Sequence, residues 1–282
     1  LTSSAVVGIT TAQIGTLDTA DIVALNTDIA NMNTASMSTL TSAQLRAFTT
    51  AQIAALDSAD VAALTSGAFD GLTIGIGLPA LTSSAIAGMT AAQVDTLSAL
   101  DVQALNTDIA NMNTSAMASL DSAQVASLVT AQVTLFDSAD ITALTTDAIV
   151  GLSSAQVAAL IASSAFSALS TAALAALTSS AVVGITTAQI GTLDTADIQA
   201  LGSDIANMNT SAMAALTSVQ LGAFTTAQAA TLDSADVAAL SSAGFDGLST
   251  ADLAALTSSA IAGMTAAQVD TLSTADVQAL GT

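Results

Sequence analysis

The side chains of this chain that could do chemistry are almost all hydroxyls and Asp carboxylates. Its 282 residues contain no His, no Cys and no Lys, and Arg46 is the single basic residue against 22 acidic residues, all of them Asp. A Ser or Thr nucleophile needs a neighbouring base, and the usual bases are missing from this sequence. The absence of thiolate and imidazole excludes most zinc and iron sites. We therefore expect that the protein is not an enzyme.

The Asp residues recur in pairs with a spacing of three. Five such pairs stand in similar segments: Asp18/Asp21, Asp57/Asp60, Asp137/Asp140, Asp194/Asp197 and Asp233/Asp236. Hard cations such as Ca²⁺ prefer clustered oxygen ligands, which makes these ten carboxylates candidate calcium ligands. However, Asp is also favoured at a helix start, where it accepts hydrogen bonds from free N–H groups and faces the positive end of the helix dipole. Because the pairs repeat, whereas an active site is normally one constellation, capping is the stronger interpretation. Weak calcium binding is the alternative, and no other cofactor is expected.

These pairs belong to an eight-residue repeat that fills almost the whole chain, in about 35 units. Residues 9–16 read ITTAQIGT and residues 56–63 read LDSADVAA. The second position of the unit is Thr, Ser, Asp or Asn, which are good N-caps. Gln or Asp follows three residues later, as in a capping box. Three units show this box in its usual form, namely Thr10/Gln13, Thr49/Gln52 and Thr186/Gln189.

The remaining positions of the unit also suit a short helix. Large apolar residues flank the box, as Ile9 and Ile14 do, and these are the two positions of a hydrophobic staple. The last positions carry Ala or Gly, and glycines at the unit ends suit a helix end, namely Gly8, Gly71, Gly184 and Gly247. Each octad therefore predicts one helix of about six residues. Such a helix is marginal by itself, so that neighbouring units must stack to stabilise it.

The expected fold is an all-α solenoid of short N-capped helices, one per repeat of about eight residues, that forms an elongated rod over residues 1–282. The alternative is a β-solenoid, because Thr, Val and Ile favour strands. The two large apolar positions are separated by five and then three residues, which breaks the period of two that a strand requires, and the abundant Ala and Gln favour helix. With few aromatic residues, the core must be thin. We expect the methionines that recur with the NMNT segments to fill gaps in it.

A longer period of about 40 residues is superimposed on the octads. It divides the chain into blocks at about 1–39, 40–80, 81–119, 120–159, 160–176 (extra units), 177–215, 216–255 and 256–282. The segment DIANMNT closes seven-residue units near 25–34, 105–114 and 201–210. We hypothesise that five octads make either one superhelical turn or one contact period in an assembly. The unit at 72–80 departs from the pattern, because Gly75, Gly77 and Pro79 disfavour helix. It is either a local break or a degenerate repeat.

The net charge of −21 limits the partners. Such a charge repels nucleic acid and anionic membrane surfaces, and it favours solubility. No uninterrupted apolar run of about 18 residues exists, so no membrane insertion is expected. The sequence begins at Leu1 without Met or a charged leader, which suggests a processed subunit or part of a longer repeat region.

The octads at 9–14, 48–53 and 185–190, with LDSADVAAL at 56–64 and 232–240, resemble Thr/Ala-rich tandem repeats of very large secreted and surface proteins of bacteria, including adhesin-like and filament-forming chains. The resemblance implies an extended, secreted or cell-surface role and no catalytic residues. We therefore expect a subunit or repeat region of an extracellular filament, surface layer or adhesin stalk. Its main partner would be itself, through end-to-end or lateral assembly. A calcium-binding or ice-binding repeat protein is the alternative.

Overall fold

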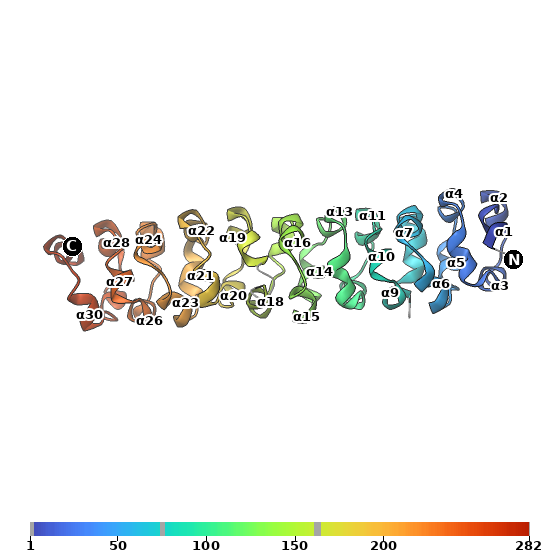
Figure 1. Cartoon of the computed structure of the whole chain (residues 1–282). Helices are drawn as coiled ribbons and strands as arrows, with labels where there is room; N and C mark the ends of the chain where they lie inside the picture. Colours follow the sequence, from blue (N-terminus) through green and yellow to red (C-terminus); the bar gives the residue numbers. More distant parts are fainter. Residues whose placement is uncertain (1–2, 74–76, 161–164, 282) are drawn as a thin grey trace. The chain divides into compact units, whose positions relative to one another are not determined.

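The computed structural model of the chain describes residues 3–73, 77–160 and 165–281, and these residues form many short helices and no strand (Figure 1). The expected all-α fold is confirmed, and the β-solenoid alternative is wrong. The reason is local: each cap residue sets a helix start, and the two apolar positions of the unit then fall on one side of a single helical turn.

The helices have four to seven residues each. Up to residue 135 they are α1 (Ser3–Val7), α2 (Thr11–Ile14), α3 (Thr19–Ala24), η1 (Asn26–Asn31), α4 (Thr34–Met37), α5 (Ser42–Arg46), α6 (Thr50–Ala55), α7 (Ser58–Ala63), α8 (Ser66–Phe69), η2 (Asp70–Leu72), α9 (Gly77–Ala80), α10 (Ser83–Ile86), α11 (Ala91–Val94), α12 (Ala99–Ala104), η3 (Asn106–Asn111), α13 (Thr114–Met117), α14 (Ser122–Ser127) and α15 (Thr130–Val133).

The later helices are α16 (Ser138–Ala143), α17 (Thr146–Ile149), α18 (Ser154–Ala159), η4 (Ala165–Ala168), α19 (Thr171–Ala176), α20 (Ser179–Val182), α21 (Thr187–Ile190), α22 (Thr195–Ala200), η5 (Gly202–Asn207), α23 (Thr210–Ala214), α24 (Ser218–Leu221), α25 (Thr226–Ala229), α26 (Ser234–Ala239), α27 (Ser242–Phe245), α28 (Thr250–Ala255), α29 (Ser258–Ile261), α30 (Ala266–Val269) and α31 (Thr274–Leu280). Helices labelled η are 3₁₀ helices.

One ordinary unit shows how the sequence produces this structure. Thr49 has extended backbone angles and caps α6, and the helix ends before Leu56, whose backbone is again extended. Ile53 within the helix and Leu56 after it are both buried, at 1% and 2% exposure. A unit therefore contributes one residue from the helix and one from the connection to the core.

The seven-residue units form 3₁₀ helices in place of α-helices. In η1, η3 and η5 the first residue has a positive φ of 49°, 52° and 53°, at Asn26, Asn106 and Gly202 respectively. Asn and Gly tolerate this left-handed conformation better than other residues do. The shorter unit thus joins the preceding α-helix to a 3₁₀ helix directly, because the left-handed residue turns the chain without an added connection.

The helices pack on helices three units earlier in the chain. Helix α7 packs on α4, α24 on α27 and α26 on α23, and the members of each pair begin 24 residues apart. The hypothesis that five octads, about 40 residues, make one superhelical turn is therefore wrong. The physical reason is that a short helix followed by an extended connection turns the chain sharply, and three such corners already bring it back over itself.

The described chain divides into two compact units, one of Leu1–Leu135 with Ala143–Gly151 and one of Phe136–Thr142 with Leu152–Thr282. Both have a thin core of Leu, Ile, Val and Ala, with single Phe residues at intervals, among them Phe69 and Phe245. The six methionines of the NMNT segments are at most 5% exposed and belong to this core, as expected: Met32, Met37, Met112, Met117, Met208 and Met213.

The irregular unit at 72–80 is helical where the structure describes it. Helix α9 spans Gly77–Ala80, so the expectation that Gly77 and Pro79 disfavour helix is wrong for these two residues. Pro79 is the third residue of the helix, where a backbone N–H has no partner within the helix and its loss therefore removes no bond. Gly75 lies outside the described residues. In the extra units at 160–176, residues 161–164 also lie outside them, and η4 and α19 follow.

Candidate functional site

The Asp pairs, the candidate metal ligands of the sequence, lie at helix starts and cap them. Asp57 Oδ1 accepts hydrogen bonds from the N–H groups of Ala59 and Asp60, at 2.8 and 3.0 Å. In return, Asp60 Oδ2 accepts from the Asp57 N–H, at 3.1 Å. Reciprocal bonds of this kind occur in all five pairs, and the others are Asp18/Asp21, Asp137/Asp140, Asp194/Asp197 and Asp233/Asp236. The capping interpretation is confirmed.

The five pairs differ in burial. The second Asp is buried in three of them, with exposures of 5% for Asp60, 7% for Asp140 and 7% for Asp236. Loss of water around the carboxyl group raises the pKa of each of these three residues, and the first carboxylate of the pair adds repulsion, partly offset by the hydrogen bond from its backbone N–H. Asp21 is exposed and Asp197 is half-buried.

Calcium binding at these pairs stays a prediction. Among residues 3–73, 77–160 and 165–281, no three or more acidic side chains come together in a group that could hold a metal. Ca²⁺ takes six to eight oxygen ligands. A pair supplies two carboxylates whose oxygens already accept hydrogen bonds from backbone N–H groups, so the remaining ligands would have to be water or main-chain carbonyls.

The Gln residues of the capping boxes have a second contact that the sequence analysis missed. In the box of α6, Gln52 Oε1 accepts a hydrogen bond from the Thr49 N–H at 2.9 Å. Its Nε2 then donates to the main-chain carbonyls of Ile22 and Asn26, at 2.8 and 3.2 Å. These two carbonyls belong to consecutive units of the preceding turn. One side chain thus closes its own helix start and also joins two turns.

The same bridge recurs along both compact units. Its donors are Gln44, Gln52, Gln93, Gln124, Gln132, Gln189, Gln220, Gln228 and Gln268, and each donates to a carbonyl 26 to 32 residues earlier. All nine are at most 6% exposed. The signal in the sequence is the complete absence of Glu, although Glu is the usual residue at this place of a capping box. Glu lacks the amide donor that the carbonyls of the preceding turn require.

Close approach between turns explains several of the glycines. A Cβ on Gly184 would collide with the main-chain carbonyl oxygen of Ser154, the first residue of α18. Gly71 and Gly247 meet a Ser carbonyl in the same way, at Ser42 and Ser218. Among the described residues, Gly202 is the one glycine with a positive φ. The unit-end glycines therefore serve the contact between turns and do not form left-handed helix ends.

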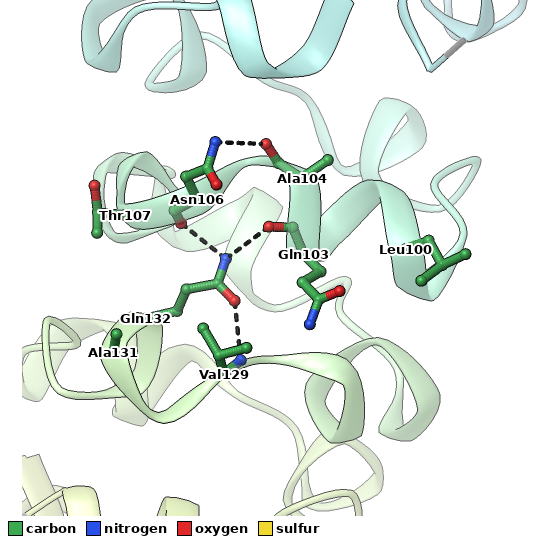
Figure 2. A pocket seen from close by; sticks show the side chains of 8 residues that line it. All are labelled: Leu100, Gln103, Ala104, Asn106, Thr107, Val129, Ala131 and Gln132. Carbon is green, nitrogen blue, oxygen red and sulfur yellow. Dashed lines mark hydrogen bonds between the residues drawn. The ribbon is translucent and has the colours of Figure 1, made fainter. Parts of the chain in front are cut away.

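Two open grooves lie beside bridging Gln residues. The larger has a volume of about 480 Å³ and lies between α12, the start of η3 and the start of α15 (Figure 2). Figure 2 shows Gln132 Nε2 reaching the carbonyls of Gln103 and Asn106 behind two exposed aliphatic side chains. Those side chains are Leu100 and Val129, at 75% and 46% exposure. The groove thus presents aliphatic surface above amide groups that are already hydrogen-bonded.

The smaller groove, of about 330 Å³, repeats this arrangement in the second compact unit. It lies between the start of α22 and the start of α24, and Val219, which is 70% exposed, stands beside the bridging Gln220. Within the described residues, no buried polar side-chain atom lacks a hydrogen-bond partner. These grooves offer apolar contact and no unsatisfied polar group that would fix the orientation of a ligand.

The comparisons with known proteins give one match. The family described as ALTTAQ repeat matches residues 28–73, 229–265 and 247–282. This match shows tandem repeats in both compact units. The search of the curated proteins gave no match.

The ALTTAQ matches cover segments that contain the features described above. Residues 28–73 include the bridging Gln52 and the buried Asp60, and residues 229–265 include Asp236. The expectation of a tandem repeat is therefore confirmed. In the described part of the chain, no helix has the length and the apolar character needed to cross a membrane.

Proposed function

We propose that this chain is a structural protein, a subunit or repeat region of an extracellular filament, surface layer or adhesin stalk. The single observation that carries the proposal is the two-sided contact between turns. Each turn presents Gln amide donors to the turn before it and main-chain carbonyl acceptors to the turn after it, as at Gln220, Ile190 and Leu193. The two sides of this contact differ, and contacts between unlike surfaces extend into open assemblies.

The use of the polar side chains supports the same proposal. Hydroxyls of Ser and Thr cap helices, the box Gln residues join turns, and paired Asp residues cap helix starts, so the groups that could do chemistry act within the fold. We infer that the protein works through its shape and its repeated surface and has no catalytic site. The resemblance to secreted and surface repeats supports an extracellular or cell-surface location.

Electron microscopy of the purified chain tests the proposal. The net charge of −21 opposes association of copies, and salt screens this repulsion. We expect single particles at low ionic strength, and strings or filaments of uniform width as ionic strength and protein concentration rise. Light scattering of the same samples is the control for aggregation of irregular size. A strictly monomeric species at high concentration and high salt would contradict the proposal.

A further inference from the structure

The capping boxes of this chain fall into two chemical kinds. In the first kind a hydroxyl hydrogen bridges the two side chains: Ser249 Oγ donates to Asp252 Oδ2 at 2.6 Å, and Thr49 Oγ1 donates to Gln52 Oε1 at 3.1 Å. In the second kind both residues are Asp, and two ionised carboxylates have no hydrogen to share. The reciprocal bonds to the backbone are the same in both kinds. An Asp–Asp box therefore lacks one bond that a Ser–Asp box has.

Two of the Asp–Asp boxes also bury one carboxyl group in surroundings without charge. Asp60 lies in α7, which packs on α4 and α10, and Asp236 lies in α26, which packs on α23 and α29. None of these four neighbouring helices contains a titratable or charged residue. The only charged group that faces Asp60 is therefore Asp57, and for Asp236 it is Asp233.

The buried carboxyl groups lie next to their partners. Asp233 and Asp236 are close enough for a hydrogen bond between the two side chains when one of them is protonated. Two carboxyl groups in this position share one proton more readily than they ionise together. The shared proton supplies the O–H···O contact that Ser249 makes with Asp252.

We propose that the Asp57/Asp60 and Asp233/Asp236 boxes are acid-responsive elements that take up one proton per pair as the pH falls below neutral, which tightens the helix start and stabilises the repeat. The proton comes from solvent, and no other bond forms or breaks. The Asp137/Asp140 box has the same hydrogen bonds and the same buried second residue.

The sign of the effect follows from the burial. In the folded chain the pKa of Asp60 and of Asp236 is raised above its ordinary value, mainly because the carboxyl group loses water. The stabilisation from protonation is thus complete below the ordinary pKa of Asp, and it is lost as the pH rises through the raised value. The folded chain is more stable in mild acid than at neutral pH.

The test compares two double variants that remove the same two charges. D60N/D236N changes the two buried positions, where the Asn amide supplies the missing hydrogen at every pH. D21N/D197N changes the same position of two Asp–Asp boxes whose second residue is not buried, so it controls for net charge and for the loss of a helix-start carboxylate. Thermal unfolding is followed by circular dichroism at about pH 7.5 and about pH 4.5, at one ionic strength and with EDTA present, which removes any contribution of calcium.

We expect D60N/D236N to raise the unfolding midpoint at neutral pH by roughly 2–4 °C and to shrink the gain on acidification relative to the unchanged chain. D21N/D197N should keep that gain. Equal midpoints and equal gains in the two double variants would overturn the proposal.

A second pair of variants covers the case in which Asn is poorly accommodated. D57S/D233S introduces the hydroxyl donor seen at Ser249, and D18S/D194S is its control in the two boxes without a buried second residue. The first should again raise the midpoint at neutral pH and lose part of the gain in acid. If both Ser variants keep the full gain, the proposal fails.

Discussion

The side-chain amide of Gln189 donates a 2.7 Å hydrogen bond to the main-chain carbonyl of Val157, 32 residues earlier in the chain. Gln189 stands in the octad ITTAQIGT at 185–192, and the same eight residues occur at 9–16, where Gln13 is the equivalent residue. Gln13 makes the same capping box with Thr10, yet it is exposed. Identical local sequences thus hold the same local structure, and only one of the two residues donates to an earlier turn in the described part of the chain.

This comparison makes the first prediction. Gln189→Glu should keep the capping box but place a carboxylate against the carbonyl of Val157, and it should lower the free energy of unfolding by about 2 kcal/mol at neutral pH. Gln13→Glu should change it by less than about 0.5 kcal/mol. Chemical denaturation followed by circular dichroism measures both. Because protonated Glu regains a donor, the loss at position 189 should shrink in acid, and a loss independent of pH would contradict the bridging role.

Two glycines with opposite environments give the second prediction. Gly184→Ala should lower the free energy of unfolding by about 1–3 kcal/mol, because the added Cβ collides with the carbonyl oxygen of Ser154. Gly191→Ala should be neutral or stabilising by up to about 1 kcal/mol, since Gly191 has helical backbone angles and a Cβ there meets only ordinary contacts. Unfolding midpoints of the two variants decide the matter. Similar losses in both would show that the backbone of the turn, and not the contact between turns, requires glycine.

The third prediction concerns the caps themselves. Thr49→Ala should remove the hydroxyl that accepts a hydrogen bond from the Gln52 N–H and cost about 1 kcal/mol of stability. The neighbouring Thr50 is exposed at the first position of α6, so Thr50→Ala should have little effect or stabilise the helix slightly. Urea unfolding of the two variants separates a capping role from a general preference for Thr on the surface.

The fourth prediction runs in the opposite direction. Val129 is in the N-cap position of α15 and provides no side-chain hydrogen bond to it. Val129→Thr should supply the cap and stabilise the chain by about 0.5–1 kcal/mol. Val183, also 46% exposed, lies at the end of α20, where a hydroxyl has no capping role, so Val183→Thr is the matched control. A gain in both variants would point to a general effect of a polar residue on the surface.

Much of the local structure could be predicted from the sequence, because its determinants lie within one unit. The bonds between Thr10 and Gln13, or between Asp57 and Asp60, span three residues, so the residue types and their spacing are sufficient to identify them. The same is true of the large apolar residues on either side of the box. The expectation for the Asp residues, mainly caps, held for this reason.

The contacts between turns could not be predicted in the same way. They join residues about 24 to 32 positions apart, and nearly identical octads give no local sign of which octads will pack together. The 40-residue sequence period suggested one arrangement, and the packing of α7 on α4 shows another. The period is a pattern of residue types, whereas the turn is set by the angle that each short helix and connection impose on the chain.

The sequence by itself determined that this protein consists of short, capped helices, since a cap acts on the N–H groups next to it whatever lies beyond. Only the tertiary structure decided that the box Gln joins two turns, that Gly184 is needed for the approach of a Ser carbonyl, and that Asp60 is buried while Asp21 is exposed. The physical reason is that burial and contacts between turns depend on which surface lies against a unit, and every unit has nearly the same sequence.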